Sequence, residues 1–253
     1  MDTPVAEGTV KIDALGLTFK DLNARLREVV ARGVQEIELY NVHGQRYIGT
    51  DLDREVAIHI HGVPGNDLGA FMKGPRLTVH GNAQDGCGNT MDEGEIVIHG
   101  HAGDIVGLAA RGGRIFVREG VGYRAGIHMK EYREKKPVVV IGGTAQDFLG
   151  EYMAGGVMVV LGLDLGPGES HRARFIGTGM HGGVIYLRGE VQSHQLGKEV
   201  GTAELDEKDQ AQLKALVEQF ASYFGHESER ILKGRFLKLF PRYLRPYGRL
   251  YTY

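Results

Sequence analysis

Residues 61–113 decide the fold, and they read HGVPGNDLGAFMKGPRLTVHGNAQDGCGNTMDEGEIVIHGHAGDIVGLAARGG. Three His-Gly pairs, which end at Gly62, Gly81 and Gly100, follow one another at intervals of 19 residues. A second glycine lies seven residues after each pair, and a third lies five or six residues further on. The same spacing surrounds Gly150. Repetition at a fixed period of about 20 residues indicates a solenoid, in which each repeat forms one coil.

Short apolar runs separate the glycines, for example Ile96-Val97-Ile98 and Ile115-Phe116-Val117. Such runs are typical of short strands that stack from coil to coil. Glycine adopts the backbone angles that tight corners need and that other residues resist. The pattern therefore predicts a mainly β fold, a right-handed parallel β-helix of about seven coils of about 19–20 residues each. We assign its corners to the following glycines: Gly62, Gly69, Gly81, Gly88, Gly94, Gly100, Gly107, Gly113, Gly143, Gly150, Gly156, Gly177 and Gly183.

The segments on either side of the coils have a different pattern. Near the N-terminus we expect a strand at 9–14 and a helix that begins after Thr18 and ends near Gly33, because Thr is a good N-cap and Gly a good C-terminal residue. Near the C-terminus we expect an amphipathic helix at 206–224 and a second helix from about Ser228. The chain thus divides into three parts: a strand–helix cap at 1–35, the β-helix at 36–190, and helices with a basic aromatic tail at 191–253.

Composition excludes several classes of protein. The 253 residues include 30 basic and 32 acidic side chains, a net charge of −2 that predicts neither a nucleic-acid nor a membrane partner. No apolar run approaches the roughly 20 residues of a membrane span. Cys87 is the single cysteine, so an internal disulfide is impossible. The N-terminus lacks the basic and apolar regions of a signal peptide, and we expect a cytoplasmic protein.

Histidines recur at one position of the repeat. Residues one coil apart lie above one another in a β-helix, so we predict a column of His43, His61, His80 and His99, here called the histidine column. It could be a metal site, a pH sensor or a structural stack of rings. Zinc needs ligands that converge in a tetrahedron, whereas a column presents them in a line. We therefore favour the stack, in which each protonated ring disfavours protonation of the next.

Carboxylates also recur, three residues before the second glycine of a coil, at Asp85, Asp104 and Asp147. Paired carboxylates serve glycosidases and calcium sites. A group that returns in each turn is better explained as a cap for backbone N–H groups. Met91 and its equivalents fit a core position, and so does Cys87. We therefore assign no catalytic, cofactor-binding or metal-binding residue to this chain.

The C-terminal tail carries six basic residues, no acidic residue and many aromatic ones from residue 231 onward. Such a tail could bind nucleic acid, dock onto a partner protein, or pack against its own β-helix as a cap. The overall charge of −2 argues against nucleic acid. We favour docking onto a partner through the following residues: Arg235, Lys238, Arg242, Tyr243, Arg245 and Tyr247.

Three segments carry a resemblance to a known family. They are residues 150–162 (GEYMAGGVMVVLG), 177–183 (GTGMHGG) and 236–243 (FLKLFPRY). In this order they resemble the GXGXG β-helix domain at the C-terminus of the glutamate synthase large subunit. The N-terminal strand–helix cap is also similar, so the resemblance covers nearly the whole chain.

The resemblance implies a β-helix that supports an FMN-containing synthase domain and a glutamine amidotransferase domain, which together move ammonia from glutamine to 2-oxoglutarate. It implies no catalytic residue and no cofactor in the β-helix itself. Here the expectation is a scaffold subunit of a multi-chain glutamate synthase or a related methylglutamate synthase, with FMN and an iron–sulfur cluster on partner subunits. Two alternatives remain: the similar β-helical subunit of formylmethanofuran dehydrogenase, and a free-standing β-helix enzyme that acts on a polysaccharide.

Overall fold

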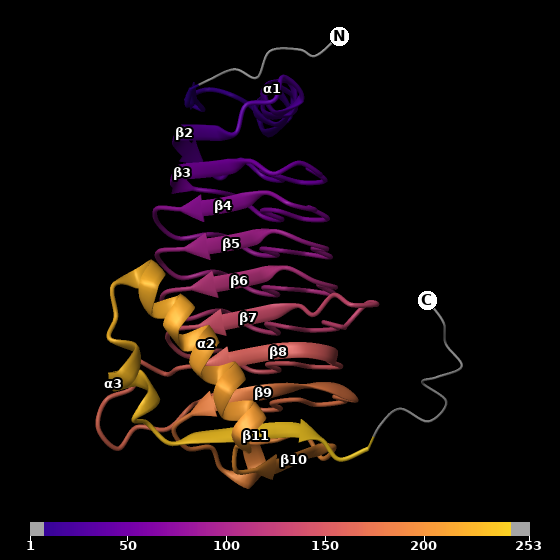
Figure 1. Ribbon diagram of the computed structural model, residues 1–253, viewed down its shortest axis with the longest axis vertical. Helices are drawn as coiled ribbons and strands as arrows, with labels where there is room; N and C mark the ends of the chain where they lie inside the picture. Colours follow the sequence, from indigo (N-terminus) through magenta and orange to yellow (C-terminus); the bar gives the residue numbers. More distant parts are fainter. Residues whose placement is uncertain (1–7, 244–253) are drawn as a thin grey trace.

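A stack of parallel strands runs along the long axis of the molecule (Figure 1). The computed structural model describes residues 8–243. From β1 to β9 each strand pairs in parallel with the next one in the chain. The bounds are β1 Val10–Asp13, β2 Glu36–His43, β3 Ala57–Val63, β4 Arg76–Val79, β5 Glu95–Ile98, β6 Arg114–Val117, β7 Val138–Ile141, β8 Ala154–Val160 and β9 Gly182–Arg188. The predicted mainly β fold with a parallel solenoid is confirmed.

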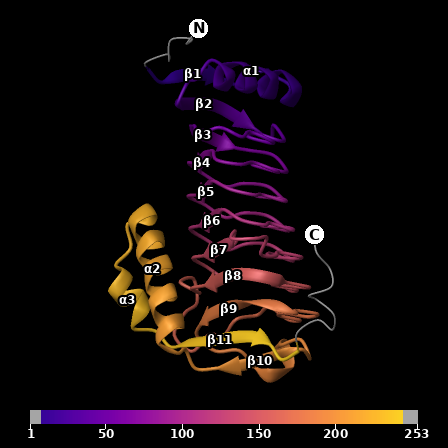
Figure 2. The same cartoon turned by 45° about the vertical axis from the view of Figure 1, so that its right-hand side comes forward.

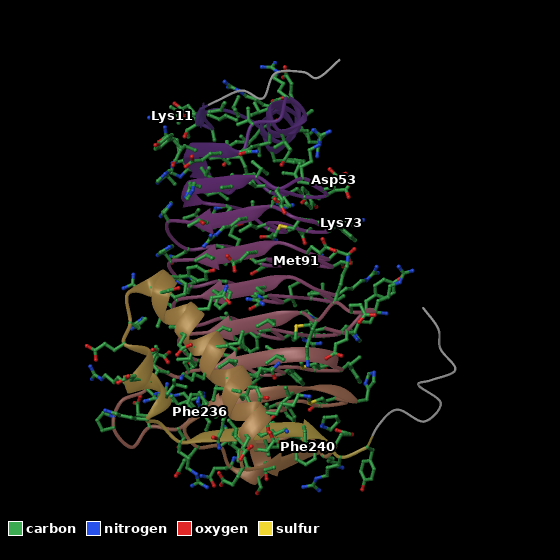
Figure 3. The ribbon with its side chains drawn as sticks, in the orientation of Figure 1. Lys11, Asp53, Lys73, Met91, Phe236 and Phe240 are labelled. Carbon is green, nitrogen blue, oxygen red and sulfur yellow. The ribbon has the colours of Figure 1, made fainter. Side chains whose placement is uncertain are left out.

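The interior of the coils is filled by side chains that repeat from strand to strand. Leu77, Ile96 and Ile115 are direct partners on β4, β5 and β6, and all three are buried. A repeat of 19 residues brings the same inward position to the same place in the next coil, so apolar side chains stack into one continuous core. Met91 fills this core, as the sequence predicts (Figure 3).

A helix closes the N-terminal end of the stack (Figure 2). Helix α1 spans Phe19–Ala31, and the side chain of Thr18 accepts a hydrogen bond from the backbone N–H of Asp21, as expected for an N-cap. Leu22 and Leu26 are buried and join the core of the coils. The helix thereby covers apolar surface that the first coil would otherwise expose.

The C-terminal segment returns to the sheet in the opposite direction. Strand β11 (Phe236–Pro241) is inserted between β9 and β10 (Val200–Ala203) and pairs antiparallel with both. Phe236 and Phe240, near its two ends, are labelled in Figure 3. A short 3-10 helix (Ser193–Gln195) precedes β10.

Helix α2 (Glu207–Phe224) lies across the outer face of the C-terminal half of the stack (Figures 1 and 2). It begins at Asp206, whose side chain accepts from the N–H of Asp209, and it ends at Gly225 in the left-handed conformation. Its apolar face and that of α3 (Ser228–Leu232) form a second core with outward side chains of β6 to β9. Within residues 8–243, no helix combines the length and apolar character that crossing a bilayer requires.

Candidate functional site

The predicted corner glycines fall into two structural groups. Ten have a positive φ: Gly62, Gly69, Gly88, Gly94, Gly107, Gly113, Gly150, Gly156, Gly177 and Gly183. The other three, Gly81, Gly100 and Gly143, lie where a Cβ would meet atoms of the preceding coil. Close approach between coils, and not backbone conformation, therefore requires glycine at these three positions.

Residues other than glycine also adopt a positive φ at the corners, which the sequence analysis missed. Apart from Asn41 and Arg133, those of the described chain lie two residues before or two residues after the second glycine of a coil, as Phe148 and Tyr152 do around Gly150. Several are exposed aromatic residues, and two pairs stack: Phe148 on Phe175, with ring centroids 4.9 Å apart, and His128 on Tyr152 at 5.4 Å. The recurrence of aromatic residues at this offset is the sequence signal that could have revealed this exposed rim.

The recurring aspartates bind backbone groups of the next coil. Oδ1 of Asp85 accepts from the N–H of Asp104 at 2.9 Å, and Oδ1 of Asp104 accepts from the N–H of Tyr123 at 2.8 Å. Asp147 accepts from both the backbone and the guanidinium of Arg174. These carboxylates cap N–H groups, as the sequence analysis favoured, but the bonds run between coils and not within one turn.

The histidine column is present with one member exchanged. On the outer face of the sheet, rings stack in the order Tyr40, His61, His80 and His99. The prediction was wrong for His43, because β2 pairs with β3 over a longer interval than the 19 residues that separate the other histidines: Leu39 pairs with Ile60 and His43 pairs with Val63. The next residue after Leu39 is Tyr40, and its ring therefore lies beside His61 in place of His43.

Partial burial lowers the pKa of two histidines in this column. The pKa of His80 is lowered first by burial and further by the neighbouring histidines. Burial, followed by the charge of Arg118, also lowers the pKa of His99. His99 meets the edge of Phe224 at the end of α2, with centroids 5.2 Å apart. The neutral, stacked state is therefore the favoured one at the middle of the column.

A second group of side chains flanks the column on β2 and β3. One ligand atom each of Glu36, Glu38 and His59 lies within 4.8 Å of the others. His61 Nε2 is 2.5 Å from Glu38 Oε2, and His59 Nδ1 is 3.4 Å from Nε2 of His80. The sequence analysis did not connect the two glutamates with the histidines, because it placed His43 at this position of the column.

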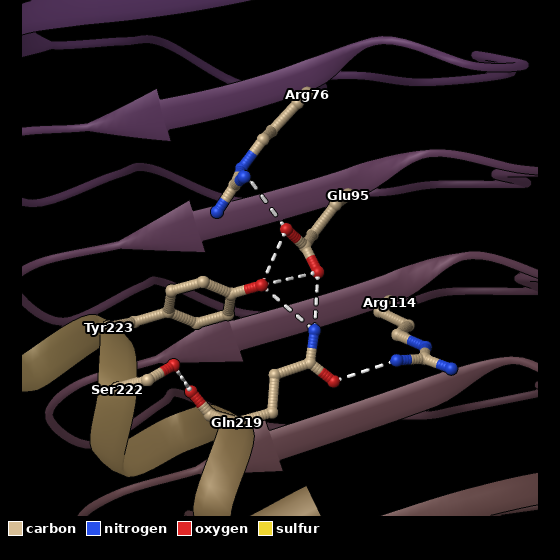
Figure 4. Close-up of polar contacts among 6 residues, drawn as sticks. All are labelled: Arg76, Glu95, Arg114, Gln219, Ser222 and Tyr223. Atoms are coloured by element: carbon tan, nitrogen blue, oxygen red, sulfur yellow. Dashed lines mark hydrogen bonds and ion pairs between the residues drawn. The ribbon is translucent and has the colours of Figure 1, made fainter.

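A polar network attaches the end of α2 to the sheet (Figure 4). Glu95 Oε1 lies 2.9 Å from the hydroxyl of Tyr223 and 3.2 Å from Nε of Arg76. Gln219 donates to Glu95 at 2.9 Å and accepts from Arg114 at 2.7 Å. Both polar atoms of the Gln219 side chain are thereby bound to the sheet, so this end of α2 is held in a fixed position.

The predicted docking residues of the tail have different surroundings. Arg235 forms an ion pair with Glu204 at 3.3 Å, with both side chains exposed. The backbone N–H of Arg242 donates to Glu199, and Tyr243 is 72% exposed. Arg245 and Tyr247 lie outside the described residues.

The first part of the tail packs against the β-helix, one of the alternatives that the sequence left open, because β11 forms hydrogen bonds with two strands of the sheet. Lys238 is on β11, and its ammonium lies 2.6 Å from the carboxylate of Asp209 on α2. The hydroxyl of Tyr186 on β9 donates to the same carboxylate at 2.7 Å. Lys238 is therefore a structural residue that ties together β11, α2 and β9.

This buried ion pair predicts a dependence of stability on pH. Burial alone would raise the pKa of Asp209, but the bonds from Lys238, Tyr186 and the N–H of Asp206 hold it below its ordinary value. A lowered pKa stabilises the fold above the unfolded pKa of about 3.9, and the contribution is lost as the pH falls through the folded pKa.

Replacing the lysine, as Lys238→Met, should lower the free energy of unfolding at neutral pH by about 1.5–3 kcal/mol, because a charged hydrogen bond is lost. The difference from the unsubstituted protein should shrink as the pH falls from about 4 through the lowered folded pKa of Asp209, because the carboxyl group then becomes neutral and no longer needs the lysine. Urea titrations at neutral and acidic pH measure both effects. Lys233→Met, at an exposed lysine just before β11, is the control; equal losses for the two variants would contradict the assignment.

A parallel β-solenoid with glycine at its corners, a helix over its first coil and an antiparallel strand at its last defines a class of glycine-cornered β-helices. The GXGXG motif family matches residues 25–245, and the chain belongs to this family. An uncharacterized protein of Methanocaldococcus jannaschii is similar throughout: it is 45% identical over 251 residues, which cover 96% of each chain. The family match begins within α1 and includes α2 and β11, so the closing strand belongs to the matched region.

Proposed function

We propose that the protein is a non-catalytic scaffold subunit of a multi-chain glutamate synthase-type complex. The observation that carries the proposal is the match of the GXGXG motif family over residues 25–245. In the glutamate synthases that the sequence resembles, this domain supports the synthase and amidotransferase domains. As a subunit of such a complex, this chain would assemble with an FMN-containing synthase subunit and a glutamine amidotransferase subunit.

The potentially reactive side chains of Cys87 and of the recurring aspartates are buried or bound to the backbone within the coils, which supports a scaffold role. Burial raises the pKa of the Cys87 thiol to about 12, and its Sγ contacts the carbonyl of Gln84, so it is a poor nucleophile. The recurring aspartates hold backbone N–H groups of the next coil. Groups that maintain the stack in this way leave the ammonia chemistry, FMN and the iron–sulfur cluster to partner chains.

Partner docking is assigned to the end of the tail. Tyr243 is the most exposed large hydrophobic residue of the described chain. The backbone N–H of Arg242 donates to the carbonyl of Glu199, directly after the end of β11. Arg245 and Tyr247 continue this basic aromatic segment. Aromatic and arginine side chains often dominate the binding energy of interfaces, which makes these four residues the docking candidates.

Purification of the untagged protein from its native host under mild conditions tests the proposal. We expect a synthase chain and an amidotransferase chain to co-purify in fixed ratio, with FMN and iron in the complex and no flavin absorption in this chain once it is separated. Co-purification with formylmethanofuran dehydrogenase chains would favour that alternative. Isolation of a single chain with polysaccharide-cleaving activity would contradict a scaffold role.

A further inference from the structure

We propose that Glu36, Glu38 and His59 form a binding site for a divalent transition-metal ion, such as Zn²⁺, on the outer face of β2 and β3. The three ligand atoms, one from each side chain, lie within 4.8 Å of one another. In a tetrahedral site with bonds of about 2.1 Å, ligand atoms are roughly 3.5 Å apart. Small rotations of the three surface side chains would shorten the separations from at most 4.8 Å to this value.

The strand register explains why these side chains meet. Glu38 is the direct partner of His59 in the parallel pair of β2 and β3, and Glu36 lies two residues earlier on the same face of β2. Side chains alternate between the two faces of a strand, so all three point outward while Ile37 and Ile58 point into the core. The backbone that carries the site is thus held by the stack itself.

Neighbouring groups orient each ligand. Nε2 of His59 faces Glu36 Oε1 at 4.0 Å, and its Nδ1 lies 3.4 Å from Nε2 of His80. With the proton of His59 on Nδ1 and donated to His80, the lone pair of Nε2 is free for a metal ion. A ligating histidine commonly donates its second N–H to a neighbouring acceptor in this way.

The two carboxylates are also held by second partners. Glu36 Oε2 accepts from the hydroxyl of Thr9 at 3.1 Å, which leaves Oε1 on the side of His59. Glu38 Oε2 accepts from Nε2–H of His61, because an ionised carboxylate only accepts. His61 in turn is stacked between Tyr40 and His80. The stacked rings thus act as the support that positions the ligands.

The site lies beyond the end of α2 on the outer face of the strands. Helix α2 ends at β5, where Tyr223 binds Glu95 and Phe224 meets His99, so the outer face of β2 and β3 lies beyond it. The side chain of His59 is 30% exposed and that of Glu36 is 51% exposed. Three protein ligands on an open face leave the remaining coordination positions to water or to a group from another molecule, as in zinc sites with an open position.

Titration of the untagged, full-length protein with Zn²⁺ after removal of metals by EDTA tests the site. We expect one ion per chain by calorimetry, a rise in melting temperature that EDTA reverses, and a visible d–d absorption when Co²⁺ replaces Zn²⁺. Since all three ligands lie on the surface, Glu38→Gln and His59→Gln should keep the fold but weaken Zn²⁺ binding by about tenfold or more. Circular dichroism verifies the fold, and Glu36→Gln provides a third variant in case one of the others unfolds.

The matched control is His101→Gln, at an exposed histidine whose ring lies 4.0 Å from Glu119. It should bind Zn²⁺ as the unsubstituted protein does. The proposal is overturned if no ion binds, or if the three site variants bind as tightly as the control. The outcome is independent of the scaffold function, since partner co-purification neither requires nor excludes this ion.

Discussion

Ending the chain after Gly234 should lower the melting temperature by roughly 10–20 °C. The deletion removes β11, which forms hydrogen bonds with both β9 and β10. It also removes Phe236 and Leu239, which are buried and contribute about 1.5–3 kcal/mol each. The surface that these two side chains cover becomes exposed to solvent. Asp209 would lose Lys238 and remain a poorly compensated charge. Together these losses are on the order of 5 kcal/mol, a large share of a typical stability of about 5–15 kcal/mol.

The loss should be confined to one end of the molecule. Each coil contacts mainly its neighbours, so the strands from β2 to β5 can remain folded while the C-terminal coils melt. Differential scanning calorimetry should therefore show an early transition followed by a later one, and hydrogen exchange should assign the early one to β8, β9 and β10.

A shorter deletion separates folding from docking. Ending the chain after Tyr243 keeps every residue that the structure describes and removes Arg245 and Tyr247. Its melting temperature should be unchanged, while partner binding should weaken about tenfold or more if these residues are interface anchors. Equal melting temperatures for the full chain and for the chain that ends after Gly234 would contradict the structural role of β11.

Gly150→Val should destabilise the protein by about 2–6 kcal/mol. Gly150 has a φ of +66°, a conformation that costs a β-branched residue about 1–3 kcal/mol. An added Cβ would also lie 2.7 Å from Cδ1 of Ile185 in the next coil, and overpacking of this kind costs a further 1–3 kcal/mol or so. Equilibrium urea unfolding measures the change.

Two further glycines separate the backbone cost from the steric cost. At Gly107, φ is +69° and a Cβ would lie 3.1 Å from Val139, so Gly107→Val should cost less than Gly150→Val. Gly168 has a φ of +80° with no atom within 4 Å of an added Cβ, so Gly168→Val carries the backbone cost alone. Equal stability of all three variants would show that crowding between coils contributes nothing.

The histidine column shows how far a periodic sequence predicts a periodic structure. His61, His80 and His99 lie at intervals of 19 residues, and the strands β3, β4 and β5 pair at the same interval. The structure therefore stacks the three rings as expected. His43 precedes His61 by only 18 residues, whereas the residues that pair between β2 and β3, such as Leu39 and Ile60, are 20 or 21 residues apart. How two strands pair decides this interval, and apolar alternation within each strand carries no signal for it.

The cluster of Glu36, Glu38 and His59 could not be predicted either, because it also depends on how β2 pairs with β3. Only the observed register places Glu38 opposite His59. A shift of one residue would move either side chain to the other face of the sheet. The role of the tail could not be predicted from its composition, because alternating aromatic and basic residues suit an interface as well as an edge strand. The ion pair of Lys238 with Asp209 joins residues 29 apart in the chain, so no local pattern indicates it.

Spacing within one coil or one helix turn was enough to predict the repeat, the corner glycines, the apolar interior and the helices at both ends. Contacts between coils and between distant segments fixed which positions face one another at β2, where β11 pairs, and which polar side chains meet. These features depend on register and on contacts between distant segments, whose free energies become favourable only after the stack has formed. Local patterns therefore predicted the body of this protein, while its polar surface sites required the packed structure.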